Sequence, residues 1–167
     1  MTEVEDQLAA AIAEARRRWP ELPDASPDFA AAVAQRIEGE PDAATAVAQL
    51  ALPDLYLVTL CLAGERTGLA AFERLVRDET TRAVAKLGAA APAAEDVVQE
   101  LLVKLLVAEA GRPAKLAAFG GHGALHAWLR VAAVRTAISL GRRRQEVAVE
   151  DETLAAGRNN RRCHVCD

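Results

Sequence analysis

The 167-residue sequence lacks several features that would place it in common classes of protein. It has no run of eighteen apolar residues, and its start, MTEVEDQ, is acidic where a signal peptide would be basic and then apolar. Because neither a membrane span nor a signal peptide is present, we expect a soluble, cytoplasmic protein that is not bound to a membrane. Aromatic residues make up only 4% of the chain, and runs of β-branched residues are few, which favours helices.

Cysteine is also scarce, with three residues in the chain. Cys61 lies in the apolar run LYLVTLCLA, where we expect it to pack as a small hydrophobic side chain. Cys163, His164 and Cys166 put three soft metal ligands in four residues, but no second Cys-x-x-Cys pair completes a tetrahedral site. We favour a disordered tail here, and we expect neither a metal nor another cofactor.

Familiar catalytic and phosphate-binding patterns are missing too. His122 and His126 are four residues apart, but no Glu follows the first, as a zinc-protease motif requires. The GGHG run at 120–123 lacks the Lys-Ser/Thr ending of a phosphate-binding loop and predicts a flexible joint between two helices. Because no Ser/His/Asp set or carboxylate pair stands out, we expect no enzyme activity.

The sequence is instead rich in Ala, Leu and Val with helical spacing. Leu8, Ile12, Ala15 and Trp19 share one helix face before Pro20 ends the segment. Further helices are predicted from an N-cap at Ser26 to Gly39, over 54–63, from a cap at Thr67 to Leu87, over 94–108 and over 125–144. With no strand pattern, the predicted fold class is all-α, a compact multi-helix bundle.

Charge is distributed unevenly along the chain. The first 111 residues hold ten basic and nineteen acidic side chains, a net charge of −9, and the remaining 56 hold ten and five, a net charge of +5. From Arg112 to Gln145 there are seven Lys or Arg residues and no Asp or Glu. This asymmetry predicts two kinds of partner, a basic protein surface for the acidic part and phosphates for the basic helix.

Two linked segments carry a resemblance to a known family. They are AAEDVVQELLVKLL at 93–106 and AFGGHGALHAWLRVAAVRTAISLGRRR at 118–144. Together they resemble region two of the bacterial sigma-70 family, closest to the small extracytoplasmic-function type. The segment at 53–76, PDLYLVTLCLAGERTGLAAFERLV, is similar to the opening helices of one divergent subgroup. The resemblance covers over half the chain.

The resemblance implies a helical domain that binds the clamp helices of the RNA polymerase largest subunit and opens the minus-ten promoter element. Residues 53–145 would form this sigma region-two-like domain, after a helical N-terminal extension at 1–52 and before a polar linker or disordered tail at 146–167. Nothing after Arg144 resembles region four, whose helix-turn-helix reads the minus-thirty-five element.

The family's polymerase-binding motif falls on one face of the predicted helix at 94–108. The matching residues are Glu95, Asp96, Gln99 and Glu100, and Val103 lies on the same face. Carboxylates beside a Gln and a small apolar residue suit charge-assisted hydrogen bonds and a dry contact with an Arg-rich coiled coil. An ordinary solvated helix face is the alternative, and the second motif favours the binding surface.

The family's promoter-melting helix falls on Trp128, Leu129, Arg130, Arg135, Arg142, Arg143 and Arg144. Trp128, Arg135 and Arg142 are seven residues apart and share one stripe, which suits stacking on an unpaired base beside its phosphates. For Trp128 a core position is the stronger alternative. The three adjacent arginines would also favourably meet the helix macrodipole.

The sequence departs from the family where Arg135 and Ser139 replace the usual Asn and Asp, which removes hydrogen-bonding groups and adds cationic charge. The expected function is that of a sigma-like initiation domain. Its partners would be core polymerase, the single-stranded non-template strand of promoter DNA and an anti-sigma factor. The alternative is a sigma-like decoy or regulator that occupies the polymerase clamp, or another protein, without directing initiation.

Overall fold

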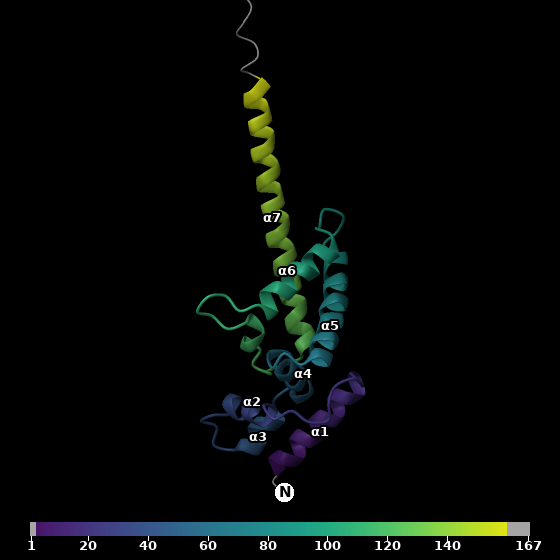
Figure 1. The fold of residues 1–167 in the computed structure, drawn as a ribbon, viewed down its shortest axis with the longest axis vertical. Coiled ribbons are helices and arrows are strands. Elements are labelled where there is room, and N and C mark those ends of the chain that lie inside the picture. The colour runs from purple at the N-terminus through teal and green to yellow at the C-terminus, as the bar shows by residue number, and fades with distance from the viewer. Residues whose placement is uncertain (1–2, 160–167) are drawn as a thin grey trace, which may run out of the picture.

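The structure is a computed structural model that describes residues 3–159. Its elements are α1 (Glu3–Arg18), α2 (Phe29–Arg36), α3 (Ala43–Ala48), α4 (Leu52–Leu62), α5 (Arg66–Ala85), α6 (Ala94–Leu106), the 3-10 turn η1 (Lys115–Ala118) and α7 (Leu125–Asn159). Residues 3–159 contain no strand, so the predicted all-α class is confirmed. Figure 1 shows a helical body from which the second half of α7 projects.

The centre of the body is α4, where nine of eleven residues are buried. A helix that is apolar all round must be covered on every side, and α1, α2, α5 and η1 contact it. Pro53 lies in its first turn, where its missing N–H is no loss and its fixed φ suits a helix. Cys61 is buried among these apolar side chains, and burial raises the pKa of its thiol to about 12. The expectation that Cys61 packs as a hydrophobic residue is therefore confirmed.

Helices α5, α6 and α7 pack against one another beside α4 (Figure 1). The predicted apolar face of α6 is buried at Val97, Val98, Leu101 and Leu105. On α7 the buried positions Leu129 and Ala133 are one turn apart, and the small side chain at 133 allows close helix approach. The N-terminal 52 residues join the same core through Ala15, Phe29, Val33 and Val47, among others.

Two helix starts differ from the sequence predictions. The N-cap of α2 is Asp28, not Ser26, and the helix begins at Phe29. The N-cap of α5 is Glu65, not Thr67, because its extended backbone lets its carboxylate accept the Gly68 N–H at 2.9 Å. The Thr67 hydroxyl donates to the same carboxylate.

The prediction that the last helix ends at Arg144 is wrong, because α7 continues to Asn159. Residues 146–159, predicted to be a polar linker or disordered tail, are therefore helical. No proline follows Pro113, and the residues after Arg144 are mostly good helix formers. Every described side chain from Arg142 to Leu154 is exposed, so this segment shows no core-facing periodicity. Cys163, His164 and Cys166 lie outside the described residues.

The GGHG run does join two helical elements, but it is packed and not loose. Gly121 is buried, has φ of +81°, and its carbonyl accepts the Ala51 N–H at 2.8 Å. A Cβ at this position would lie 2.5 Å from Leu55 Cδ1, which leaves room only for glycine. The run thus fixes the start of α7 against α4.

Within residues 3–159, no single helix is long and apolar enough to cross a membrane. Only α4 and α5 taken together satisfy the length and composition, and they bend by 118° where they meet.

One buried carboxylate joins the N-terminal and C-terminal parts of the fold. Asp54 of α4 accepts the backbone N–H of Leu125, the first residue of α7, at 2.8 Å, and the Arg18 guanidinium of α1 at 3.2 Å. The first N–H groups of a helix have no partner within it. Asp54 therefore acts as a cap supplied from 71 residues away.

We predict that Asp54→Ala lowers the free energy of unfolding by about 2–3 kcal/mol, because it leaves the buried Leu125 N–H without an acceptor. The matched control is Asp78→Ala, at an exposed carboxylate of α5, which should change stability by less than about 0.5 kcal/mol. Urea denaturation of both variants measures the difference. Equal effects would show that Asp54 does not hold α7.

Candidate nucleic-acid interface

Trp128, for which the sequence left a core position and a base-stacking position open, lies one turn into α7. Its indole is half-buried and packs edge-to-face on Phe119, with ring centroids 5.8 Å apart and an interplanar angle of 65°. It also borders the main hydrophobic core. The rest of the ring faces an open groove, so Trp128 is anchored by packing and still accessible.

The groove lies between α6, η1 and α7 and has a volume of about 350 Å³. Its cationic lining residues are Lys104, Lys115 and Arg135. Its apolar lining comes from residues that include Leu101, Leu105, Val131 and Ala132. Among residues 3–159 no carboxylate lines it, although Lys104 reaches out of the groove to Glu100 at 3.2 Å. An indole beside three cations is an arrangement that suits flat, anionic molecules.

The structure does not bring all the predicted DNA-binding residues to this groove. Arg130 instead pairs at 2.9 Å with Glu79, whose side chain is only 5% exposed. Together with Arg82, this guanidinium compensates a buried charge. Arg142 is exposed and lines a different depression beside Pro92.

Arg143 and Arg144 also lie away from the groove, because each is held by the acidic face of α6. Arg143 donates to Glu100 at 2.8 Å, and Arg144 donates to Asp96 at 2.6 Å. The hydrogen bond from Arg143, followed by that from Lys104, lowers the pKa of Glu100. The predicted polymerase-binding and DNA-binding sets are thus joined by ion pairs within one chain.

The other residues of the acidic face are partly engaged as well. Gln99 donates to Glu95 at 3.1 Å, and Arg77 of α5 pairs with the same carboxylate. The hydrogen bond from Gln99, followed by that from Arg77, lowers the pKa of Glu95. Val103 is 59% exposed with no polar role. The face therefore combines paired carboxylates with one exposed apolar side chain.

Sequence reasoning missed Lys104 and Lys115 as groove residues, and Phe119 as the packing partner of Trp128. Lys115 lies ten residues before α7 in the chain, and Lys104 lies on the helix assigned to a different partner. Only the packing of η1 against α6 brings them to Trp128. The one available signal was the run of basic residues without carboxylates from Arg112 onward, which includes Lys115.

Comparisons with protein-family models, with curated proteins and with solved structures find no match for this chain.

We predict that the double variant Arg143→Gln/Arg144→Gln loses less than about 1 kcal/mol of stability, because both ion pairs are exposed to solvent. Arg130→Gln should cost more, about 1–3 kcal/mol, since it removes one of the two arginines that compensate the buried Glu79. Chemical denaturation of both variants tests this ranking. The reverse order would contradict the assignment of Arg130 to a structural role.

Proposed function

We propose that this protein is a sigma-like transcription initiation domain that binds core RNA polymerase and contacts the unpaired strand of the minus-ten promoter element. The observation that carries the proposal is the groove in which Trp128 is surrounded by Lys104, Lys115 and Arg135. The resemblance of 93–106 and 118–144 to sigma region two supports the choice of partners.

The chemistry of the groove suits an unpaired nucleotide. Stacking of one base on an aromatic side chain contributes roughly 1–3 kcal/mol, whatever the base. The indole is held in place by Phe119, so little rotamer freedom is lost when a base stacks on it. The lysines and the arginine can neutralise the phosphates on either side of that base. Among the described residues, Thr136 and the indole N–H of Trp128 are the neutral polar groups on side chains that line the groove, so we expect weak base selectivity.

The acidic face of α6 is the proposed contact with polymerase. Asp96 and Glu100 already accept hydrogen bonds from arginines of the same chain, in the geometry that a partner's arginines would use. An arginine-rich coiled coil could replace Arg143 and Arg144 at little cost, because one exposed ion pair is exchanged for another. That exchange would free Arg143 and Arg144 for phosphates.

A decoy that binds the polymerase clamp without directing initiation is the second candidate. It is favoured by the same ion pairs, because Arg143 and Arg144 are partly neutralised and Arg130 is committed to Glu79. Because Lys104 also pairs with Glu100, the cations left for DNA are then chiefly Lys115, Arg135 and Arg142.

We predict weak, salt-dependent binding of single-stranded DNA. With three phosphates neutralised, the slope of log K against log salt should be about −2. Trp128→Ala should weaken binding about 5- to 100-fold, from the loss of one stacked base, and Lys115→Gln should reduce the slope. Arg66→Gln, at an exposed position on α5, is the matched control. Fluorescence anisotropy of a labelled oligonucleotide measures both quantities, and a slope near zero would contradict the site.

We predict that Asp96→Arg/Glu100→Arg abolishes retention of this chain on immobilised core polymerase. Reversed charge on the acidic face repels a basic partner, and each broken charge pair at an interface can cost about 2–5 kcal/mol. Glu38→Arg/Asp78→Arg, which changes the net charge equally at exposed positions elsewhere, is the control. Undiminished retention of the first variant, with its helical circular dichroism intact, would refute the proposed contact.

Transcription from a pre-melted template separates initiation from the decoy. Because stacking of one base cannot open a duplex, we expect this chain to support transcription from a pre-melted minus-ten region and not from linear duplex. Trp128→Ala should remove that activity while polymerase binding persists. If wild-type protein is silent on pre-melted DNA yet blocks a competing sigma factor, the decoy function is correct.

A further inference from the structure

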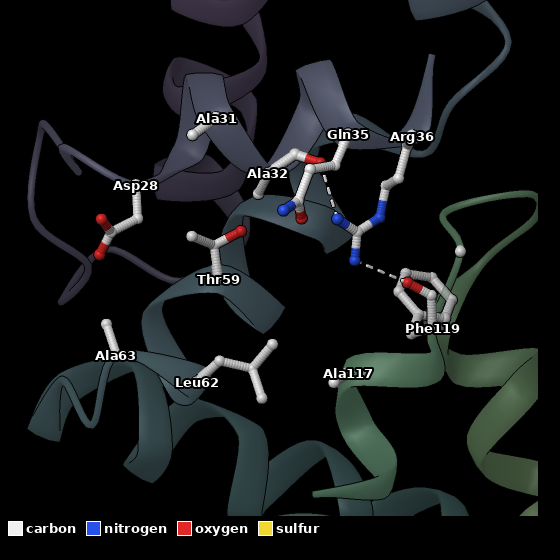
Figure 2. A pocket seen from close by; sticks show the side chains of 11 residues that line it. Asp28, Ala31, Ala32, Gln35, Arg36, Thr59, Leu62, Ala63, Ala117 and Phe119 are labelled. Atoms are coloured by element: carbon white, nitrogen blue, oxygen red, sulfur yellow. Dashed lines mark hydrogen bonds between the residues drawn. The ribbon is translucent and has the colours of Figure 1, made fainter. Parts of the chain in front are cut away.

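A second cavity lies on another part of the body, between α2, the end of α4 and the segment after η1 (Figure 2). Its volume is about 550 Å³, within the range of small-molecule sites. Most of its lining is apolar, contributed by Ala31, Ala32, Leu62, Ala63, Ala117 and Phe119. Leu62 is 45% exposed and contributes a large aliphatic side chain to the accessible lining of the cavity.

The polar end of this cavity is formed by Arg36. Its terminal nitrogens donate to the carbonyls of Ala32 at 2.7 Å and of Phe119 at 3.0 Å, and its Nε is buried with no hydrogen-bond partner. No carboxylate among the described residues forms an ion pair with it. Burial lowers the pKa of the guanidinium. A partly desolvated cation whose hydrogen-bond partners are all neutral is stabilised when an anion binds beside it.

The geometry of the guanidinium leaves room for that anion. Each terminal nitrogen carries two N–H groups, and only one on each is used by a carbonyl. Figure 2 shows the terminal nitrogens on the side of the cavity, across from Thr59 and Ala117. Two remaining N–H groups on neighbouring nitrogens match the two oxygens of a carboxylate.

Asp28 restricts the ligand at the opposite end. Figure 2 shows its carboxylate across the cavity from Arg36, with Gln35 and Thr59 between them and the alanine side chains and Leu62 around. A second negative charge on the ligand would approach Asp28 and be repelled. The cavity therefore has one cationic end, one anionic end and a middle where mostly apolar side chains are joined by Gln35 and Thr59.

We propose that this cavity binds a small organic monocarboxylate with an apolar body, its carboxylate on Arg36 and its body against Leu62 and Phe119. The site does not depend on the proposed function. Phe119 nevertheless lies between the two cavities, since it lines this one and its ring packs on Trp128. Occupation of the site therefore changes the surroundings of the Trp128 indole, which provides an optical readout.

The test uses octanoate as the probe. Binding is measured by calorimetry on the full chain and by the fluorescence of Trp128 in a Trp19→Phe background, because these are the two tryptophans. We expect saturable, sub-millimolar binding of octanoate with one site. Acetate lacks the body, 1-octanol lacks the charge, and octanedioate adds a charge near Asp28. Each should bind at least ten-fold more weakly.

Three variants locate the site. Arg36→Met should weaken octanoate binding at least ten-fold and leave 1-octanol unaffected. Leu62→Glu should also weaken octanoate binding at least ten-fold. Because Leu62 is exposed, this variant should fold and keeps the test valid if Arg36→Met does not fold. Arg112→Met, an exposed arginine outside the cavity, is the control and should bind octanoate as wild type does. The proposal is overturned if octanoate does not saturate, if 1-octanol binds equally well, or if Leu62→Glu leaves binding unchanged.

Discussion

The Asp54 carboxylate is the contact on which the arrangement of the two ends of the chain depends. It caps α7 through Leu125 and meets Arg18 of α1, and it does so from the most deeply buried helix. Gly121 adds a second constraint, because its approach to Leu55 sets where the turn before α7 can lie. Trp128 follows Leu125 by three residues. Its position against Phe119 and its access to the groove are therefore consequences of how α4 holds α7.

Electrostatics connect the two faces proposed to bind polymerase and DNA. The sequence separates net charges of −9 and +5 along the chain, but folding brings them together where Arg143 and Arg144 meet Glu100 and Asp96. Opposite charges at exposed positions contribute little to stability, and they exchange easily with those of a partner. A basic partner that binds the acidic face of α6 would release Arg143 and Arg144 for phosphates. An anionic partner that binds those arginines would release Glu100 and Asp96 for a basic partner. Binding of one is thus expected to favour binding of the other.

Much of the fold could be predicted from local pattern, because the apolar faces of α1 and α6 and the proline at the start of α4 are properties of short segments. The length of α7 could not be predicted, because a fully solvated helix segment has no apolar periodicity in its sequence. Long-range contacts could not be predicted either. The sequence around Asp54 does not indicate that its carboxylate caps a helix 71 residues later. The same holds for the groove, where Trp128 and Arg135 were predicted but Lys104 and Lys115 come together only through packing. Arg130 matched the promoter-melting pattern of the family, but its guanidinium pairs with the buried Glu79.

The central claim is that an unpaired base stacks on Trp128 in the groove. A single-stranded oligonucleotide carrying 5-iodouracil, irradiated with this chain and analysed by mass spectrometry, tests the claim directly because stacked aromatic side chains form the photoadduct. The account predicts an adduct on Trp128 that is lost when Lys115 and Arg135 are replaced by Gln. An adduct confined to other residues, or one on Trp128 that is indifferent to those two cations, would contradict it.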